Sequence, residues 1–269
     1  MRKHVFAAAA VACLVFGASL SAIRYGTPDG DGHPFVGLMV AKDAAGNPLW
    51  RCSGTLLSPT VFLTAGHCTE SPAVSAEIWF ESQVFRGDPA TGYPFEGPTS
   101  VSGTTHTHPQ YNPGAFFLYD LGVVTLDTPV ARSAYGALPI VGTLDGLATR
   151  RGLKNTTITA VGYGLQQTRP NPAGPNFTLS DLWREVAETR LISVNGTTGI
   201  PGGTSVILSD NANTGGTCFG DSGGPLFYGS SNTVVAVTSF GINQNCAGIG
   251  GGYRVDMPDD LAWVESFLQ

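Results

Sequence analysis

The sequence predicts an antiparallel, all-β protein. The chain of 269 residues contains 36 glycines and 18 prolines, and only 13% of its residues are charged. That composition is typical of many short strands joined by turns, and helix-rich proteins usually carry more charge. A chain of this length could form one large β domain or two small ones, and either could bury a sizeable core.

The expected strands are short apolar or alternating segments, each bounded by clusters of Gly, Pro, Asn or Ser. They cover residues 36–41, 52–57, 61–64, 78–80, 121–126, 157–163, 185–192, 205–208, 226–228, 234–240 and 252–255. Residues 166–176 are rich in Pro and Gly and could be an interdomain linker or a surface loop. Because strand-like segments flank them closely, they are interpreted as a long loop within the second half of the chain.

One helix is expected at the C-terminus, over residues 259–269. It follows Pro258, begins with acidic residues and places four apolar side chains on one face. These side chains are Leu261, Val264, Phe267 and Leu268. A helix that docks on a β body is therefore predicted.

Residues 1–22 have the pattern of a secretory signal peptide: basic residues, then an apolar run, then small residues. A membrane anchor is the alternative, but the apolar run is short for a bilayer. Cys13 lies inside this run and would be discarded with it. Four cysteines then remain, Cys52, Cys68, Cys218 and Cys246. An even number in an exported protein favours two disulfides, and no closely spaced pair predicts a metal site.

The charge of the chain argues against a polyanionic partner. The formal net charge is −6, and loss of Arg2 and Lys3 with the signal would leave 12 basic against 20 acidic residues, or −8. Lys and Arg are scattered along the sequence without a basic stripe. A nucleic-acid partner is therefore not expected.

The segment 220–225, GDSGGP, is the most informative for chemistry. Glycines leave the hydroxyl of Ser222 open, and successive backbone N–H groups in such a turn can point at one developing negative charge. These are the needs of an acyl-transfer nucleophile. A plain glycine-rich turn between two strands is the structural alternative.

A serine nucleophile needs a neighbouring base, and histidine has the suitable pKa. His4 would leave with the signal, while His33, His106 and His108 fit surface or loop positions. His67 follows an apolar segment and precedes Cys68, so a disulfide there would restrict the imidazole.

The imidazole in turn needs a carboxylate that fixes its tautomer. Asp120 is an acid enclosed by apolar residues, and burial of an unpaired carboxylate would be costly. It is therefore expected to have a partner, although a strand-capping or edge position is an alternative interpretation.

Three segments together resemble the signature segments of chymotrypsin/trypsin-like serine proteases. They are residues 64–68 (TAGHC), 120–124 (DLGVV) and 220–225 (GDSGGP), in that family's chain order. Residues 108–112, residues 161–164 and Trp263 also resemble family landmarks, so the resemblance covers essentially all of residues 23–269. It implies two six-stranded antiparallel Greek-key β-barrels packed together, with the active site between them and a C-terminal helix.

The resemblance also implies a role for each matching residue. His67 would be the general base, Asp120 its orienter and Ser222 the nucleophile, with the N–H groups of Gly220 and Ser222 as the oxyanion hole. Disulfides Cys52–Cys68 and Cys218–Cys246 would match two family bridges. No cofactor or metal is implied.

Activation by a new N-terminus is a further implication of the resemblance. Asp221 would pair with the amine of Ile23 after cleavage before that residue. The second residue of such a start is normally small and apolar, and here it is Arg24. Cleavage after Ala22 would produce this amine during export, whereas cleavage after Ser19 or Ser21 would leave a very short pro-segment.

The specificity pocket by this resemblance has its base at Gly216 and Thr217, where a trypsin-type enzyme would offer an aspartate. Gly241 and Gly251 would fall on its walls, and the segment from Ser239 through Phe240 to Gly241 would pair with the substrate backbone. An uncharged, open slot favours an aromatic or large aliphatic side chain. Asp210 is the residue that could alter this preference, if its loop bends inward.

The expected function is thus that of an exported, monomeric serine endopeptidase with polypeptide substrates, and a protein inhibitor is a candidate partner. The alternative is a catalytically silent or narrow-target relative that mainly binds a protein. Weaker signals are N-glycosylation patterns at Asn155, Asn176 and Asn195 and acidic residues where some relatives bind calcium. Those acids, Glu70, Glu77 and Glu81, are interpreted as solvated charges.

Overall fold

The computed structural model describes residues 23–147, 156–166, 168–171, 174–177, 182–196, 200 and 202–269. The expected signal peptide, residues 1–22, lies outside the described residues, as does Asn155. No helix in the described part of the chain is long and apolar enough to cross a membrane.

The first half of the chain forms a closed six-stranded antiparallel barrel. Its strands in spatial order are β2 (Val36–Lys42), β3 (Pro48–Leu56), β4 (Val61–Thr64), β8 (Gly122–Leu126), β7 (Val101–Thr107) and β5 (Ser75–Trp79). β5 pairs again with β2, which closes the barrel, with Met39 opposite Ile78. Its core holds fully buried Leu38, Phe62 and Trp79.

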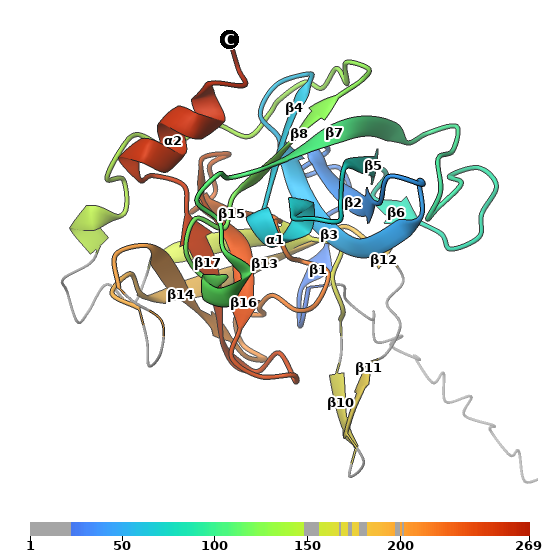
Figure 1. Cartoon of the computed structure of the whole chain (residues 1–269). Coiled ribbons are helices and arrows are strands. Elements are labelled where there is room, and N and C mark those ends of the chain that lie inside the picture. Colours follow the sequence, from blue (N-terminus) through green and yellow to red (C-terminus); the bar gives the residue numbers. More distant parts are fainter. Residues whose placement is uncertain are drawn as a thin grey trace, which may run out of the picture.

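The second half closes a second six-stranded barrel, as expected from the resemblance (Figure 1). Its strands in spatial order are β13 (Glu185–Ser193), β14 (Ser205–Asp210), β17 (Gly248–Arg254), β16 (Val234–Gly241), β15 (Pro225–Tyr228) and β9 (Thr157–Gly162). β9 pairs with β13 and completes the ring, and the two-residue strand β1 (Thr27–Pro28) adds to the outside of β13.

Segments from the two halves also pair with each other. β12 (Leu182–Trp183) pairs with β6 (Gln83–Val84). Between β12 and β13, Arg184 is 1% exposed, and its Nε lies 2.8 Å from Asp29 Oδ2. Its guanidinium also donates to the carbonyls of Val36 and Phe80 in the first barrel. A buried, fully bonded cation of this kind fixes the two barrels against each other.

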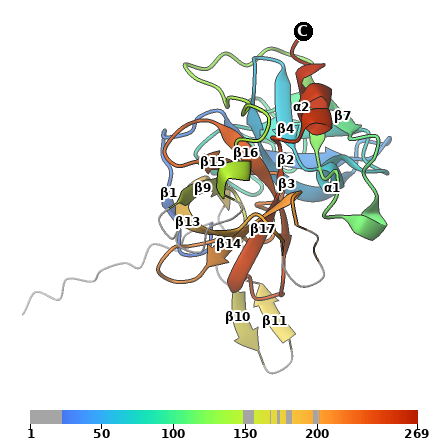
Figure 2. The same ribbon diagram turned by 90° about the vertical axis from the view of Figure 1, so that its left-hand side faces the viewer.

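The predicted loop at residues 166–176 contains a hairpin instead. β10 (Thr168–Asn171) and β11 (Gly174–Phe177) pair with each other and project from the second barrel in both ribbon views (Figures 1 and 2). The interpretation of this stretch as part of the second half is right, whereas its description as loop is wrong.

The C-terminal helix α2 (Pro258–Glu265) is shorter than the predicted segment 259–269. Leu261 and Val264 are buried in a core cluster that consists mostly of first-barrel residues, although α2 follows the last strand of the second barrel. The ring of Trp263 packs edge-on against His108, with centroids 4.9 Å apart. The helix therefore connects the two halves at the outer end of the molecule (Figure 2).

Candidate active site

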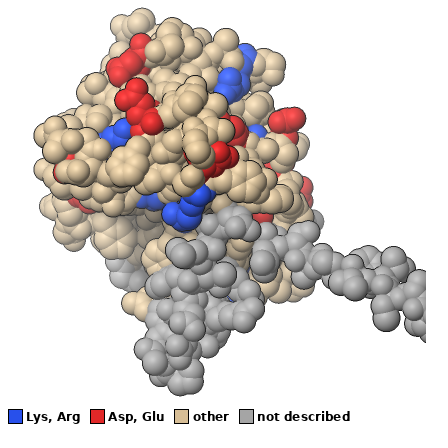
Figure 3. All heavy atoms as spheres, turned by 90° about the vertical axis from the view of Figure 1, so that its right-hand side faces the viewer, with Lys and Arg blue, Asp and Glu red and all other residues tan. Residues whose placement is uncertain are grey.

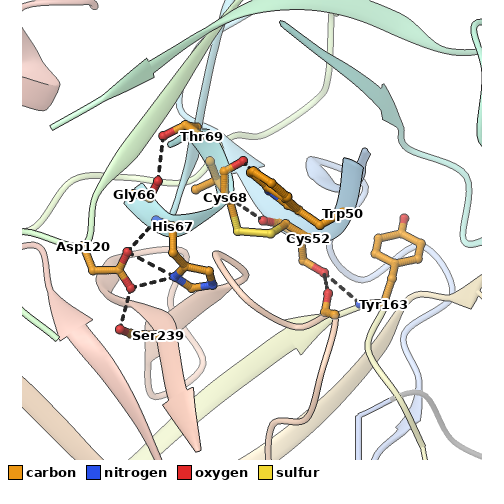
Figure 4. The surroundings of a disulfide bond; sticks show 12 residues. Trp50, Cys52, Gly66, His67, Cys68, Thr69, Asp120, Tyr163 and Ser239 are labelled. Carbon is orange, nitrogen blue, oxygen red and sulfur yellow. Dashed lines mark hydrogen bonds and ion pairs between the residues drawn. A yellow bond between two sulfur atoms is a disulfide. The ribbon is translucent and has the colours of Figure 1, made fainter. Parts of the chain in front are cut away.

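His67 lies on a one-turn helix, α1 (Gly66–Thr69), directly after β4. The predicted disulfide joins Cys68 to Cys52 in β3, with a Cα–Cα distance of 6.2 Å. Trp50 Nε1 donates a 2.9 Å hydrogen bond to the carbonyl of Cys68 (Figure 4). These two contacts hold the backbone beside the imidazole, as a positioned base requires.

Asp120 is fully buried and meets His67 through three hydrogen bonds. His67 N donates to Asp120 Oδ1 at 2.8 Å, and His67 Nδ1 lies 3.1 Å from Oδ1 and 2.9 Å from Oδ2. Ser239 Oγ donates a further bond of 2.5 Å to Oδ2 (Figure 4). The carboxylate therefore has the partners that its burial demands, and the alternative of a plain edge charge is not supported.

The pKa of His67 is raised above its ordinary value of 6.5. Burial alone would lower it by disfavouring the imidazolium, but the Asp120 charge and hydrogen bond outweigh burial, with a smaller contribution from Glu70. The side chain keeps 24% of its surface exposed. The imidazole is thus both oriented and accessible.

Ser222 lies in a turn between Cys218 and β15 that is closed by local backbone bonds. Asp221 N donates to the carbonyl of Cys218 at 3.0 Å, and Gly223 N donates to the carbonyl of Thr238 at 2.7 Å. Gly220 and Gly223 have φ of +96° and +77°, in the left-handed region that favours glycine. The turn therefore needs glycine on both sides of the serine.

The serine turn of the second barrel packs directly on the end of β4 in the first. Ser53 N donates to the carbonyl of Ser222 at 2.8 Å. A Cβ on Gly223 would lie 2.0 Å from Thr64 Oγ1 and 2.7 Å from the backbone N of Ala65. This close approach brings the turn to the residues just before His67, and both His67 and Ser222 line one cavity of about 510 Å³.

The predicted oxyanion donors are also free. Neither Gly220 N nor Ser222 N donates a hydrogen bond to another described residue. Two free N–H groups in the same turn as the Ser222 hydroxyl can bind an oxyanion that forms there. The guanidinium of Arg51 lies where a side chain at Gly220 would begin, because a Cβ there would lie 2.7 Å from Arg51 Nη2.

The cavity walls contain part of the predicted substrate site. Thr217, Ser239, Phe240 and Gly241 line it, together with Cys218 and Cys246 of the second predicted disulfide, whose Cα atoms are 5.3 Å apart. Phe219 and Ile242 add half-exposed apolar side chains.

Gly216 and Gly251 are not among the residues that line this cavity, so their place in the specificity pocket stays a prediction. A Cβ on Gly251 would lie 2.1 Å from the Phe240 ring, and one on Gly216 would lie 2.1 Å from Asp210 Cγ. A neighbouring side chain therefore fills the space that each glycine leaves.

Asp221, the residue before Ser222, is buried among backbone N–H groups of the second half of the chain. Its carboxylate is 1% exposed and accepts from Gly164 N at 2.7 Å and Cys218 N at 2.8 Å. Burial raises the pKa of Asp221 to about 7, although these hydrogen bonds and the nearby Arg51 charge act to lower it. Ile23 is fully buried in the second barrel's core cluster. The predicted ion pair between these residues stays a prediction.

One of the three acidic residues that follow His67 differs from its predicted description. Glu77 is 1% exposed and is not a solvated charge, because it pairs with Lys42 Nζ at 2.7 Å and accepts from Ser102. Cys52, His67 and Cys68 place possible ligand atoms within 4.8 Å of one another, but the two sulfurs are bonded to each other and offer no thiolate.

Comparison with known proteins gives a consistent set of relatives. The trypsin family model matches residues 28–261. Brachyurin of Leptuca pugilator is 30% identical over 224 residues, which cover 82% of this chain and 85% of brachyurin. A trypsin of Saccharopolyspora erythraea is 28% identical over 230 residues, covering 80% and 83% of the two chains.

Solved structures of similar fold include an HL collagenase and the human heparin binding protein. The collagenase superposes with a TM-score of 0.68 at 20% identity, over 91% of this chain and 97% of the collagenase. The human heparin binding protein gives a TM-score of 0.62 at 20% identity, over 91% and 96%. At such identities the likeness is one of fold.

Proposed function

This chain belongs to the trypsin family, and on that premise we propose that it is an exported serine endopeptidase that works through an acyl-enzyme on Ser222. The observation that carries the proposal is the His67–Asp120 pair, which reaches the same cavity that Ser222 lines. A nucleophile, a base and an orienting carboxylate at one cavity form the arrangement that acyl transfer requires.

In the first half of the reaction, Ser222 Oγ attacks the peptide carbonyl while His67 Nε2 accepts its proton. Asp120 stabilises the imidazolium through Nδ1 and holds the ring in the correct tautomer. The new oxyanion is bound by Gly220 N and Ser222 N, and one such donor contributes about 3 kcal/mol of transition-state stabilisation. His67 then donates its proton to the leaving amine, and the C–N bond breaks.

Deacylation repeats these roles with water. His67 takes a proton from the attacking water, the same N–H pair binds the second oxyanion, and the proton returns to Ser222 as the acid product leaves. This mechanism uses no cofactor, because the nucleophile, the base and the oxyanion donors all come from the chain. Phe240 and Gly241 at the end of β16 would pair with the extended substrate backbone.

The walls of the cavity favour a large uncharged side chain before the scissile bond. Thr217, Gly241 and Ile242 carry no charge, and Phe219 adds an apolar surface. An aromatic or large aliphatic side chain would bury apolar area against such walls.

Export is proposed from the leader pattern of residues 1–22 and from the two disulfides. Disulfides persist in oxidising compartments and are rare in the cytosol. Removal of the leader before Ile23 would also produce the amine that Asp221 is proposed to receive.

A binding protein without catalytic activity is the alternative, since one solved structure of similar fold is named for heparin binding. Heparin is a polyanion, whereas this chain has a net charge of −6. Lys and Arg are interspersed with Asp and Glu on the face shown in Figure 3 and form no continuous basic surface there. All three catalytic residue types are also in place, so the enzyme is the better-supported function.

The test is a serine-directed fluorophosphonate applied to the purified mature protein, followed by mass spectrometry of the labelled peptide and by cleavage of a mixed peptide library. We expect the label on Ser222 and hydrolysis of peptides, with both absent in Ser222→Ala. A correctly processed protein that takes no label and cleaves nothing would refute the proposal.

A further inference from the structure

Arg24 contacts two walls of the candidate active-site cavity, although it does not line the cavity itself. Its backbone forms an antiparallel bridge with Gly216, in which Gly216 N donates to the Arg24 carbonyl at 3.0 Å. Gly216 directly precedes the first wall, residues 217–219, all of which line the cavity. The backbone of Arg24 is therefore fixed beside this first wall.

The side chain of Arg24 reaches a second wall, residues 241–246. Five of these six residues line the cavity, with Asn245 as the exception. Arg24 Nη1 donates to the carbonyl of Asn245 at 2.7 Å and also to the carbonyl of Cys246. Arg24 Cζ lies 4.9 Å from the centroid of the Tyr25 ring, which packs on the guanidinium. One side chain thus bonds two successive carbonyls of the second wall.

The other bonds of the second wall are a disulfide and contacts within the loop. Cys246 is bonded to Cys218, which joins the two walls at one point. Asn243 Nδ2 donates to the carbonyl of Ala247 at 2.6 Å, and Asn243 Oδ1 accepts from Asn245 N at 3.0 Å. These bonds of Asn243 shape the loop but do not place it against another element. Residues 241–245 are exposed, so the contact with Arg24 adds a constraint on their position.

We propose that Arg24 is a positioning residue that holds the two walls of the substrate cavity at a fixed separation. This role rests on the proposed function and deepens it. The disulfide alone would let the exposed loop turn about Cys246, whereas hydrogen bonds to two carbonyls fix its orientation as well. Such bonds are strong because the guanidinium that donates them is charged. The role belongs to the side chain of Arg24 and is separate from that of the Ile23 amine.

A small apolar side chain, which the resemblance leads us to expect at residue 24, could not reach these carbonyls. Arg24→Val therefore removes the contact with the second wall and keeps the backbone bridge to Gly216. Arg24 Nε is buried without a hydrogen bond to a described residue, so the substitution also removes an unsatisfied donor. The variant is thus expected to fold. Arg24→Lys keeps the charge on a shorter side chain without the planar guanidinium.

The experiment compares the wild type with Arg24→Val, Arg24→Lys and the matched control Arg190→Val. Arg190 is an exposed arginine on β13 that does not line the cavity. Steady-state kinetics with the best peptide substrate of the wild type give kcat and KM. The rate of fluorophosphonate labelling reports on Ser222, and hydrogen–deuterium exchange reports on the amides of residues 242–247. N-terminal mass spectrometry checks that all four chains begin at the same residue.

We expect Arg24→Val to raise KM about tenfold, because it removes charged hydrogen bonds that fix a wall of the cavity. kcat and the labelling rate should stay within a factor of about two of the wild type, because the catalytic groups are unchanged. The amides of residues 242–247 should exchange faster, and those of residues 220–224 should not. Arg24→Lys should recover part of the loss, and Arg190→Val should match the wild type.

Unchanged KM or unchanged exchange of residues 242–247 in Arg24→Val would overturn this role. A fall in kcat and labelling at constant KM would also overturn it, because Arg24 would then act on the serine turn. If Arg24→Val does not fold, the same measurements on Arg24→Lys decide the question. A wild type that takes no label and cleaves nothing would refute the proposed function, whereas the exchange of residues 242–247 would still test the contact that Arg24 makes.

Discussion

Ser239 Oγ donates a 2.5 Å hydrogen bond to Asp120 Oδ2, the same oxygen that lies 2.9 Å from His67 Nδ1. Ser239 belongs to β16 of the second barrel, whereas His67 and Asp120 belong to the first. The bond therefore ties the catalytic carboxylate to the barrel that carries Ser222. It aligns the carboxylate across the barrel interface and satisfies a lone pair that would otherwise be buried without a partner.

Ser239→Ala is expected to weaken catalysis without removing it. A hydrogen bond to a charged group contributes about 1.5–3 kcal/mol, so kcat should fall roughly tenfold to 100-fold while KM changes little. The measurement is steady-state kinetics with one peptide substrate, with the thermal unfolding midpoint as a check on folding. Ser239→Thr keeps the hydroxyl and should recover part of the loss. Equal kcat in wild type and Ser239→Ala would show that the carboxylate does not need this bond.

The strands that sequence predicted well are those with buried, apolar residues. The prediction for β4 coincides with Val61–Thr64, and that for β15 begins one residue late. β7 was missed because its segment, VSGTTHT, alternates weakly and is only partly buried. Threonine-rich strands of this kind are specified by their pairing with β5 and β8 more than by their own hydrophobicity.

In the candidate site, too, local sequence indicates some features and misses others. His67, Asp120 and Ser222 each lie in a segment whose sequence fits its role, so a single chain can indicate them. The hydrogen bond of Ser239 to Asp120 joins residues that lie far apart in the chain. This pair follows from how β16 is placed, which no local pattern records.

The pH profile of kcat/KM should have its acid limb above pH 6.5. The Asp120 charge raises the pKa of His67 above that value, and only the neutral imidazole can accept the Ser222 proton. Activity should therefore be lost as the pH falls through the raised pKa.

Asp120→Asn is the matched variant for this profile. Without the carboxylate, burial is opposed only by the smaller contribution of Glu70, so the pKa of His67 should fall and the acid limb should move to lower pH. kcat should drop by about 10⁴ because the tautomer is no longer fixed. An acid limb at the same pH in both proteins would contradict the assignment of His67 as the titrating base.

The amine of Ile23 is expected to control activity through Asp221. Burial raises the pKa of Asp221 to about 7, and a cationic amine beside it would restore the charged form. A chain with one Ala added before Ile23 lacks this amine at the right position and should lose about 100-fold or more in kcat/KM, since breaking a buried pair costs about 3–5 kcal/mol. Kinetics and N-terminal mass spectrometry on both chains provide the measurement.

If the amine of Ile23 pairs with Asp221, activity should also have an alkaline limb. An α-amine has an ordinary pKa of about 8, and pairing with Asp221 would raise it, so activity should fall as the pH rises through the raised value. Ile23→Val keeps a free amine and an apolar side chain and should retain the limb. Full activity in the extended chain would show that the turn at Ser222 forms without this ion pair.

Gly251→Ala should disturb substrate binding more than catalysis. The added Cβ would lie 2.1 Å from the Phe240 ring, which is 7% exposed and lines the cavity, so the ring must move into the pocket or toward Phe116. Overpacking of this kind costs about 1–3 kcal/mol. We expect KM to rise severalfold with kcat within a factor of two or so of wild type. Gly146→Ala is the control, because a Cβ there meets nothing within 4 Å. A fall in kcat with unchanged KM would mean that Phe240 acts on the catalytic residues and not on the pocket wall.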